Sequence, residues 1–252
     1  TIARALDIPV TTGDAYTVAI AGQAMLEAGR LMGADPAQAR AAVVGATGAI
    51  GAACSALLAQ EVAHLTLVGR RADALAAVRE RCEGGRAGLA TDTDLTAIHN
   101  ADLILTVTSA IGAIIEPEHL KPGAVVLDVA RPRDVSRRVA AERRDVLVIE
   151  GGMVEVPGPV DFHFDFGFPP GKAYACMAET MALALEGRYE DYTVGRDITL
   201  QRVREIEAIA ARHGFRLSGL RSFEREVTVE HIAEVRERAY RARRMRPALR
   251  PA

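Results

Sequence analysis

The stretch that decides the fold is RAAVVGATGAIGAACSALLAQ, residues 40–60. Its first five residues form a mostly apolar run that predicts a buried strand, and its Ala- and Leu-rich end predicts a helix. Three glycines, Gly45, Gly48 and Gly51, fall between the strand and the body of the helix. A strand, a glycine turn and a helix in this order can hold a phosphate group at the amino end of the helix.

Each glycine has a separate task in such a unit. Gly45 permits the tight turn, Gly48 lets the backbone approach a pyrophosphate, and Gly51 lets the helix pack closely on the strand. A second apolar run about 20 residues further on strengthens the interpretation as a dinucleotide site. The alternative is a packing turn that binds no ligand. The cofactor-binding residues predicted here are Gly45, Ala46, Thr47, Gly48, Ala49, Ile50 and Gly51.

Four more apolar runs follow: HLTLVGRR from residue 64, ADLILTVTS from 101, GAVVLDVA from 123 and DVLVIEGG from 145. Continuous apolar strands are buried on both faces, and their alternation with helices is typical of a parallel sheet. The sequence therefore predicts an α/β fold with a doubly wound parallel Rossmann sheet. A helical C-terminal region should flank it, with amphipathic helices near residues 171–187, 198–213 and 228–243.

The changes along the chain predict three parts. Residues 1–35 should form a linker helix, from about residue 11 to 32, that comes from an N-terminal region. Residues 36–152 should form the dinucleotide-binding Rossmann domain, and residues 153–252 a helical substrate and catalytic segment. Because the first residue is Thr1 and not Met, we expect an N-terminal substrate domain to be missing from this sequence.

The bulk composition excludes several classes of function. A net charge of -2 among 252 residues gives no basic field, which argues against general nucleic-acid binding. No apolar run is long enough to span a bilayer, and no signal-peptide pattern is present, so a cytoplasmic location is expected. Three scattered cysteines are too few for a disulfide framework or a thiolate zinc site, and no metal is predicted.

The end of the second strand indicates which dinucleotide binds. Gly69 is followed there by Arg70 and Arg71, whose guanidinium groups suit the 2′-phosphate of NADPH and cannot accept from a free ribose hydroxyl. The ends of the later strands should line the same crevice, with small residues near the nicotinamide. These further predicted contacts are Thr108, Ser109, Ala130, Gly151, Gly152 and Met153.

Cys176 is the cysteine with a candidate chemical role. Pro169, Pro170 and Gly171 cannot lie inside a helix, so a helix should begin near Gly171 or Lys172. This start places the Cys176 thiol within the first two turns of the helix. There the helix dipole and Lys172 would favour the thiolate, and hence a nucleophile. The alternative is a small core residue on the buried helix face. Cys54 is expected to be a core residue, and Cys82, at the end of a surface helix, is expected to have no chemical role.

The segment DFHFDF, residues 161–166, alternates acidic or His side chains with Phe. If extended, it has one polar and one aromatic face. His163 is a candidate acid/base or thiol-orienting group, and the alternatives are a metal site with Asp161 and Asp165 or a solvent-facing edge.

Five motifs together resemble the fatty acyl-ACP reductases that make fatty aldehydes. They are TTG at 11–13, GATGAIG at 45–51, GGMVE at 151–155, YACMAE at 174–179 and HGF at 213–215. The similarity runs from about residue 11 to 217, and YACMAE is its most specific element. The stretch VVLDVARPRDV, residues 125–135, also looks like the NADP-binding domain of glutamyl-tRNA reductases and, more distantly, shikimate dehydrogenases.

The resemblance implies NADPH-dependent reduction of a fatty acyl thioester to an aldehyde, with Cys176 as the acyl-carrying nucleophile. Acyl carrier protein or acyl-CoA would be the partner, and the sequence also allows a homo-oligomer. The loop from Pro157 to Pro170 departs from the family pattern, so acyl length and carrier stay undetermined. One alternative is an NADPH-dependent ketone or imine reductase akin to shikimate dehydrogenases, with Cys176 as packing. The other is a nucleotide-binding module that needs a partner domain.

Overall fold

The computed structural model describes residues 2–164, 167–223 and 225–245. Its main sheet has the strand order β11-β10-β6-β5-β4-β1-β2-β3, and β1 to β6 are parallel. The prediction of a doubly wound parallel sheet is therefore confirmed. The strands are β1 (Arg40–Val44), β2 (His64–Val68), β3 (Gly88–Asp92), β4 (Leu103–Thr106), β5 (Val125–Asp128), β6 (Leu147–Glu150), and the antiparallel β10 (Arg221–Ser222) and β11 (Arg225–Glu226).

Alternate side chains of the parallel strands enter two separate apolar cores, one on each face of the sheet. In β4, Leu103 and Leu105 enter one core, and Ile104 enters the other. Helices α2 (Asp14–Leu31), α3 (Ala49–Leu58) and α4 (Ala72–Cys82) contribute to the first core. The second core includes residues of η2 (Leu95–Ile98) and α5 (Arg137–Glu142), and Leu120, which directly follows η3 (Pro117–His119). Burial on both faces explains why these strands are continuous apolar runs.

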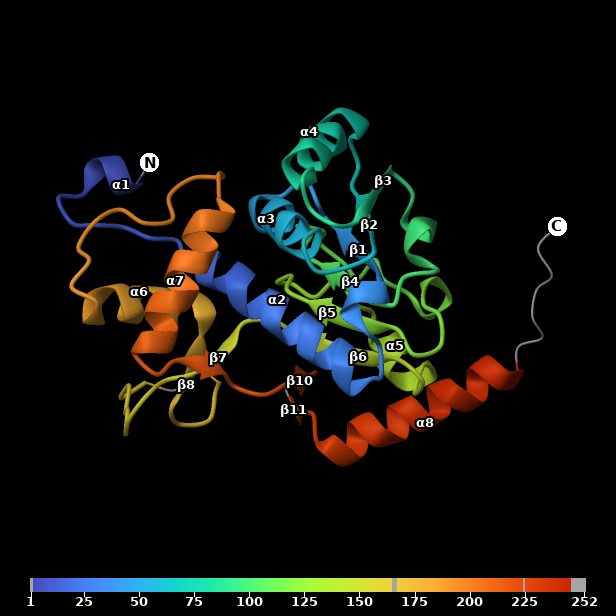
Figure 1. Ribbon diagram of the computed structural model, residues 1–252. Coiled ribbons are helices and arrows are strands. Elements are labelled where there is room, and N and C mark those ends of the chain that lie inside the picture. The colour runs from blue at the N-terminus through green and yellow to red at the C-terminus, as the bar shows by residue number, and fades with distance from the viewer. Residues whose placement is uncertain (1, 165–166, 224, 246–252) are drawn as a thin grey trace.

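A second group of elements lies beside the main sheet (Figure 1). It contains α6 (Ala175–Leu185), α7 (Leu200–Arg212) and a small sheet of order β8-β7-β9. That sheet pairs β7 (Met153–Glu155) with β8 (Lys172–Tyr174) and β9 (Arg216–Leu217), both antiparallel. Helix α2 runs from this group across to the main sheet, and α8 (Val229–Met245) runs along the lower side (Figure 1). The short α1 (Ile2–Ala5) and η1 (Pro36–Gln38) complete the elements described.

The predicted helices need one correction at their starts. We expected a helix from about residue 171, but α6 begins at Ala175. Residues 172–174 are instead strand β8, because they pair with β7. The other expected helices agree with α2, α7 and α8 to within about three residues. In the described part of the chain, no helix has both the length and the apolar character needed to cross a membrane.

Small residues on α2 let its neighbours approach closely. A Cβ added to Gly29 would lie 2.9 Å from a methyl carbon of Leu103 in β4. At the other end of the helix, a Cβ added to Gly13 would lie 2.2 Å from the Cα of Cys176. Gly13 also has a φ of 78°, in the left-handed region, and it caps α2. Only glycine satisfies both constraints, since any side chain would separate α2 from α6.

We therefore expect Gly13→Ala to destabilise the protein strongly. The left-handed conformation costs about 1–2 kcal/mol for a residue with a Cβ, and the steric overlap adds roughly 1–3 kcal/mol. Gly158 is a matched control, because its φ is 79° and nothing lies within 4 Å of an added Cβ. In urea unfolding, the free energy of unfolding of Gly158→Ala should fall only by the cost of the left-handed conformation. Equal losses in the two variants would contradict the close packing at Gly13.

Candidate functional site

The glycine turn lies where the sequence predicts it, between β1 and α3. Gly45 has a φ of 85°, and its N–H donates to the carbonyl of Val68 at 3.0 Å. A Cβ on Gly51 would lie 2.2 Å from the Gly45 carbonyl oxygen, so the helix packs directly on the turn. Gly48 is the N-cap of α3, and a Cβ there would make only ordinary contacts of 3.4 Å or longer.

This geometry fits a dinucleotide pyrophosphate. The first N–H groups of a helix have no acceptor within the helix, and they carry its positive dipole end. The backbone at Gly48 has room for a ligand close by, whereas the glycines on either side are packed against protein. The turn therefore combines free donors, a positive field and close access in one place.

The two arginines after β2 are both exposed at the carboxyl edge of the sheet. Arg71 is the N-cap of α4, and its guanidinium lies 3.8 Å from the Asp73 carboxylate, with both side chains more than 70% exposed (72% and 78%). Arg70 makes no ion pair with any residue that the structure describes. Either guanidinium can turn toward a 2′-phosphate at little energetic cost, because an exposed ion pair is weak.

The loop after β4 lies directly against the glycine turn, since a Cβ on Gly45 would be 2.6 Å from the Val107 carbonyl oxygen. Of the two residues predicted to contact cofactor there, Ser109 is exposed. Thr108 uses both its hydroxyl and its N–H as donors to the buried carboxylate of Asp134. The Thr108 side chain therefore holds the loop, which is a role that the sequence analysis did not assign.

Two contacts bring Cys176 to the carboxyl edge of the sheet. The N–H of Ala175, at the start of α6, donates to the Gly152 carbonyl at 2.6 Å. Gly152 follows β6, so the predicted nicotinamide-side glycines are tied to the helix that carries the cysteine. On the other side of Cys176 lies the backbone of Gly13. Cys176 itself is partly buried, whereas Cys54 and Cys82 are buried.

Glu179 is a buried acid, with none of its surface exposed, three residues after Cys176. Its carboxylate accepts from the hydroxyl of Thr11, from the Tyr16 N–H at 2.8 Å and from the Thr193 hydroxyl at 2.8 Å. Three donors offset the cost of burying the charge. The sequence analysis quoted Glu179 and Thr11 within two motifs but gave neither residue a role. Their contact connects those motifs across 168 positions.

Burial raises the pKa of the Cys176 thiol above its ordinary value, and the Asp14 and Glu179 carboxylates raise it further. The N–H groups of Met177 and of Cys176 itself act in the opposite direction. The expected net stabilisation of the thiolate by the helix dipole and Lys172 is therefore wrong for the protein without ligands. Lys172 lies on β8, opposite Glu155 on β7, and burial with the two acids outweighs the helix N–H groups.

The other predicted catalytic residue, His163, is exposed on a loop. Its φ is 51°, its N–H donates to Asp161 at 2.8 Å, and its ring Nδ1 lies 3.3 Å from the same carboxylate. The residue is thus not part of an extended segment, and Asp165 lies outside the described residues. Within the described residues, no hydrogen bond or ion pair joins His163 or Lys172 to Cys176, and no cluster of three metal-binding side chains occurs.

Comparison with known proteins gives two kinds of match. The family model described as "Shikimate / quinate 5-dehydrogenase" matches residues 27–150. The chain is 33% identical over 216 residues to the long-chain acyl-[acyl-carrier-protein] reductase of Synechococcus elongatus, a match that covers 81% of this chain and 61% of that protein. It is 32% identical over 235 residues to the aminotransferase PigE of a Serratia species, which covers 91% of this chain and 27% of that protein.

Among solved structures, the shikimate 5-dehydrogenase of Listeria monocytogenes matches 85% of this chain and 61% of its own, with a TM-score of 0.43 and 14% identity. The quinate dehydrogenase of Corynebacterium glutamicum matches 52% of this chain and 50% of its own, with a TM-score of 0.40 and 19% identity.

The chain thus spans about a quarter and about three fifths of the lengths of the two curated relatives. The TTG, glycine-turn and YACMAE motifs fall within the part of the fold just described, with the first and last in contact through Glu179. Two resemblances inferred from the sequence are confirmed: the chain is a homologue of a long-chain acyl-ACP reductase, and residues 27–150 match the shikimate and quinate dehydrogenase model. The resemblance to glutamyl-tRNA reductases stays a prediction.

Proposed function

We propose that this chain carries out the NADPH-dependent reduction of a fatty acyl thioester to an aldehyde, through an acyl-enzyme on Cys176. Its relatives support an oxidoreductase that uses a nicotinamide dinucleotide. The proposal extends this to NADPH, to acyl-ACP or acyl-CoA as substrate, and to a covalent step. It also assigns residues 1–35 to a linker helix, 36–152 to cofactor binding and 153–252 to the substrate and catalytic segment.

One observation carries the proposal: the hydrogen bond from Ala175 N–H to the Gly152 carbonyl. Gly152 lies at the sheet edge where the nicotinamide half of a dinucleotide binds in this type of fold. Ala175 precedes Cys176 and begins α6. A short link between these two points supports a shared chamber for the sulfur and the hydride donor, which an acyl-enzyme reduction requires.

In the first step, Cys176 Sγ forms a bond to the acyl carbon, and the carrier sulfur leaves with the electron pair of the broken thioester bond. The carboxylates of Asp14 and Glu179 both act electrostatically on the thiol, and we assign acceptance of the thiol proton to Asp14 because Glu179 is engaged by three donors. The N–H groups of Cys176 and Met177 lie against the sulfur and can stabilise negative charge there.

In the second step, bound NADPH would supply the hydride that reduces the acyl carbon. The Cys176 sulfur then leaves with the electrons of its bond to that carbon, and the aldehyde forms. The partial burial of Cys176 reduces access of water, which would otherwise hydrolyse the acyl-enzyme to a fatty acid. The cycle restores the thiol when a proton returns to Cys176.

An aldehyde product would suit a following transamination. The Serratia relative is named as an aminotransferase, and the match covers 27% of it. Aminotransferases transfer amino groups to carbonyl carbons. Transfer of an amino group to a fatty aldehyde is therefore a class of reaction that would consume the proposed product.

The covalent step predicts an acyl adduct on Cys176. Mixing with acyl-CoA in the absence of NADPH should add the mass of the acyl group to the peptide that contains Cys176. Cys54 and Cys82 should stay unmodified because burial raises their pKa to about 12 and about 11. Cys176→Ala should abolish both the adduct and aldehyde formation. Turnover at the normal rate in Cys176→Ala would instead favour a dehydrogenase-like reductase of the kind that the family model describes.

The raised pKa of Cys176 predicts slow alkylation at neutral pH. Because only the thiolate reacts, the iodoacetamide labelling rate of Cys176 should still be rising above pH 9 in the protein without ligands. Asp14→Asn removes a negative charge that raises the pKa of the Cys176 thiol, so it should move this rise to lower pH. The control Asp7→Asn removes the same charge from an exposed residue and should change nothing. An unchanged profile in Asp14→Asn would contradict the proposed role of Asp14.

The cofactor assignment predicts a selective loss of affinity. Replacing Arg70 and Arg71 with Ala should weaken NADPH binding by about tenfold or more, because charge-assisted hydrogen bonds to the 2′-phosphate are lost. NADH lacks this phosphate, so its binding should change little. Fluorescence titration of both cofactors gives the two affinities. Equal losses for NADPH and NADH would contradict a 2′-phosphate site at these arginines.

A further inference from the structure

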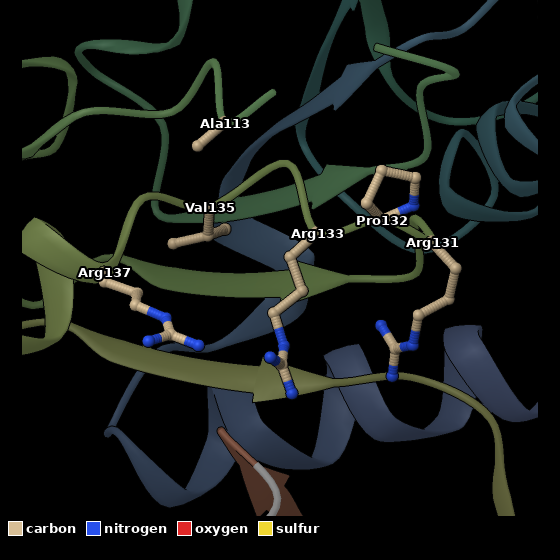
Figure 2. Close-up of a pocket in the computed structure, with 6 residues that line it drawn as sticks. All are labelled: Ala113, Arg131, Pro132, Arg133, Val135 and Arg137. Carbon is tan, nitrogen blue, oxygen red and sulfur yellow. The ribbon is translucent and has the colours of Figure 1, made fainter. Parts of the chain in front are cut away.

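A cavity of about 370 Å³ lies at the carboxyl edge of the sheet, and neither the nucleotide turn nor Cys176 lines it. Three of its six lining residues are arginines: Arg131, Arg133 and Arg137. Figure 2 shows their side chains directed the same way from the segment that follows β5, which also carries Val135, while Ala113 lies on a separate loop. We call this cavity the arginine pocket. Among the residues between β5 and α5, the sequence analysis placed only Ala130 in the crevice.

Buried carboxylates fix the loop that carries the first two arginines. Asp128, at the end of β5, accepts from the N–H groups of Ala130 and Val135, both at 3.0 Å. Asp134 is fully buried and accepts from the hydroxyl of Thr106 at 2.5 Å. The loop is therefore held from its inner side, and its arginines lie on the outer side. A loop held in this way loses little further entropy when an anion binds.

The charges facing the arginine pocket favour an anion. Glu150 lies 2.9 Å from Arg133 and 3.5 Å from Arg131, so one carboxylate serves two guanidinium groups. The Arg131 side chain stays 48% exposed. Arg137 is exposed and makes no ion pair with any described residue. The three guanidinium groups form a row, with Arg133 between Arg131 and Arg137 (Figure 2), and such a row suits a phosphate, which accepts several charge-assisted hydrogen bonds.

The arginine pocket adjoins the surroundings of Cys176. Arg131 also lines a second, smaller cavity, together with Gly151, Met153 and Tyr174. Tyr174 is the N-cap of α6, two residues before the cysteine. A ligand with its anionic end in the arginine pocket could therefore extend past Arg131 toward the start of α6. The 2′-phosphate and pyrophosphate of NADPH are already accounted for at Arg70, Arg71 and the glycine turn.

We propose that Arg131 and Arg137 bind the phosphate of a phosphopantetheine arm, the group that carries an acyl thioester. This rests on the proposed function, because it gives a phosphate-bearing thioester a reason to be present. The arm has a phosphate at one end and the thioester sulfur at the other. Acyl-CoA and acyl-ACP share it, so the arginine pocket would recognise the carrier group and leave the acyl chain to other residues.

The test compares 4′-phosphopantetheine with pantetheine, which lacks the phosphate, by calorimetry on the full chain. Wild type should bind 4′-phosphopantetheine at least tenfold more tightly, and Arg131→Gln and Arg137→Gln should each remove most of that difference. Arg144→Gln is the control, because Arg144 is an exposed arginine that does not line the pocket. Equal affinities in wild type would overturn the proposal. The proposal would also be overturned if Arg137→Gln lost as much affinity for NADPH as for 4′-phosphopantetheine, because the pocket would then bind the cofactor.

Kinetics with both carriers distinguish the source of the phosphate. If the arginine pocket binds the shared arm, Arg137→Gln should raise KM for acyl-CoA and for acyl-ACP by a similar factor, about tenfold, with little change in kcat. A higher KM for acyl-ACP alone would mean that Arg137 contacts the carrier protein. A higher KM for acyl-CoA alone would mean that Arg137 contacts the nucleotide end of coenzyme A. Either result overturns the proposal. If no adduct forms on Cys176 while the phosphate preference remains, only the proposed function fails.

Discussion

The backbone of Gly13 lies against the backbone of Cys176, and no side chain fits between them. This contact fixes the start of α2 against the start of α6. The rest of α2 is buried against α3 and the main sheet, with Gly29 close to Leu103 of β4. One helix thus sets the position of the cysteine relative to the strands. The hydrogen bond between Ala175 and Gly152 attaches the same point to β6 directly, so the sulfur is held from two sides.

Buried carboxylates supply the second layer of organisation. Glu179 holds the TTG segment through Thr11, and Asp134 holds the loop after β4 through Thr108. Asp128 holds the loop after β5, and burial raises its pKa to about 6 despite the N–H donors of Val135 and Ala130. Each acid replaces its lost hydration with donors from a neighbouring loop. The loops at the functional edge are therefore ordered by polar contacts, whereas the strands are ordered by apolar packing.

The sequence predicted the parallel sheet and the glycine turn well, because both are local patterns. It missed β3, whose side chains are largely exposed at the sheet edge and so form no apolar run. The three-residue strands β7 and β8 are too short to show alternation, and overlooking β8 led to the early start expected for α6. The expected direction of the Cys176 pKa was also wrong, because burial of the thiol, and after it the carboxylates of Asp14 and Glu179, act through tertiary structure. The grouping of Arg131 with Arg137 likewise depends on how the loop turns after β5.

The two close contacts of α2 also limit how the chain can vary in length. Gly13 and Gly29 each lie against a fixed neighbour, about 24 Å apart along the axis at 1.5 Å per residue. One inserted residue between them would rotate one contact by about 100° relative to the other and advance it by about 1.5 Å. The two close approaches could not both survive this rotation without a compensating bulge in the helix. Insertions and deletions should therefore accumulate in connecting segments such as the loop between β7 and β8, while the number of residues in α2 stays constant.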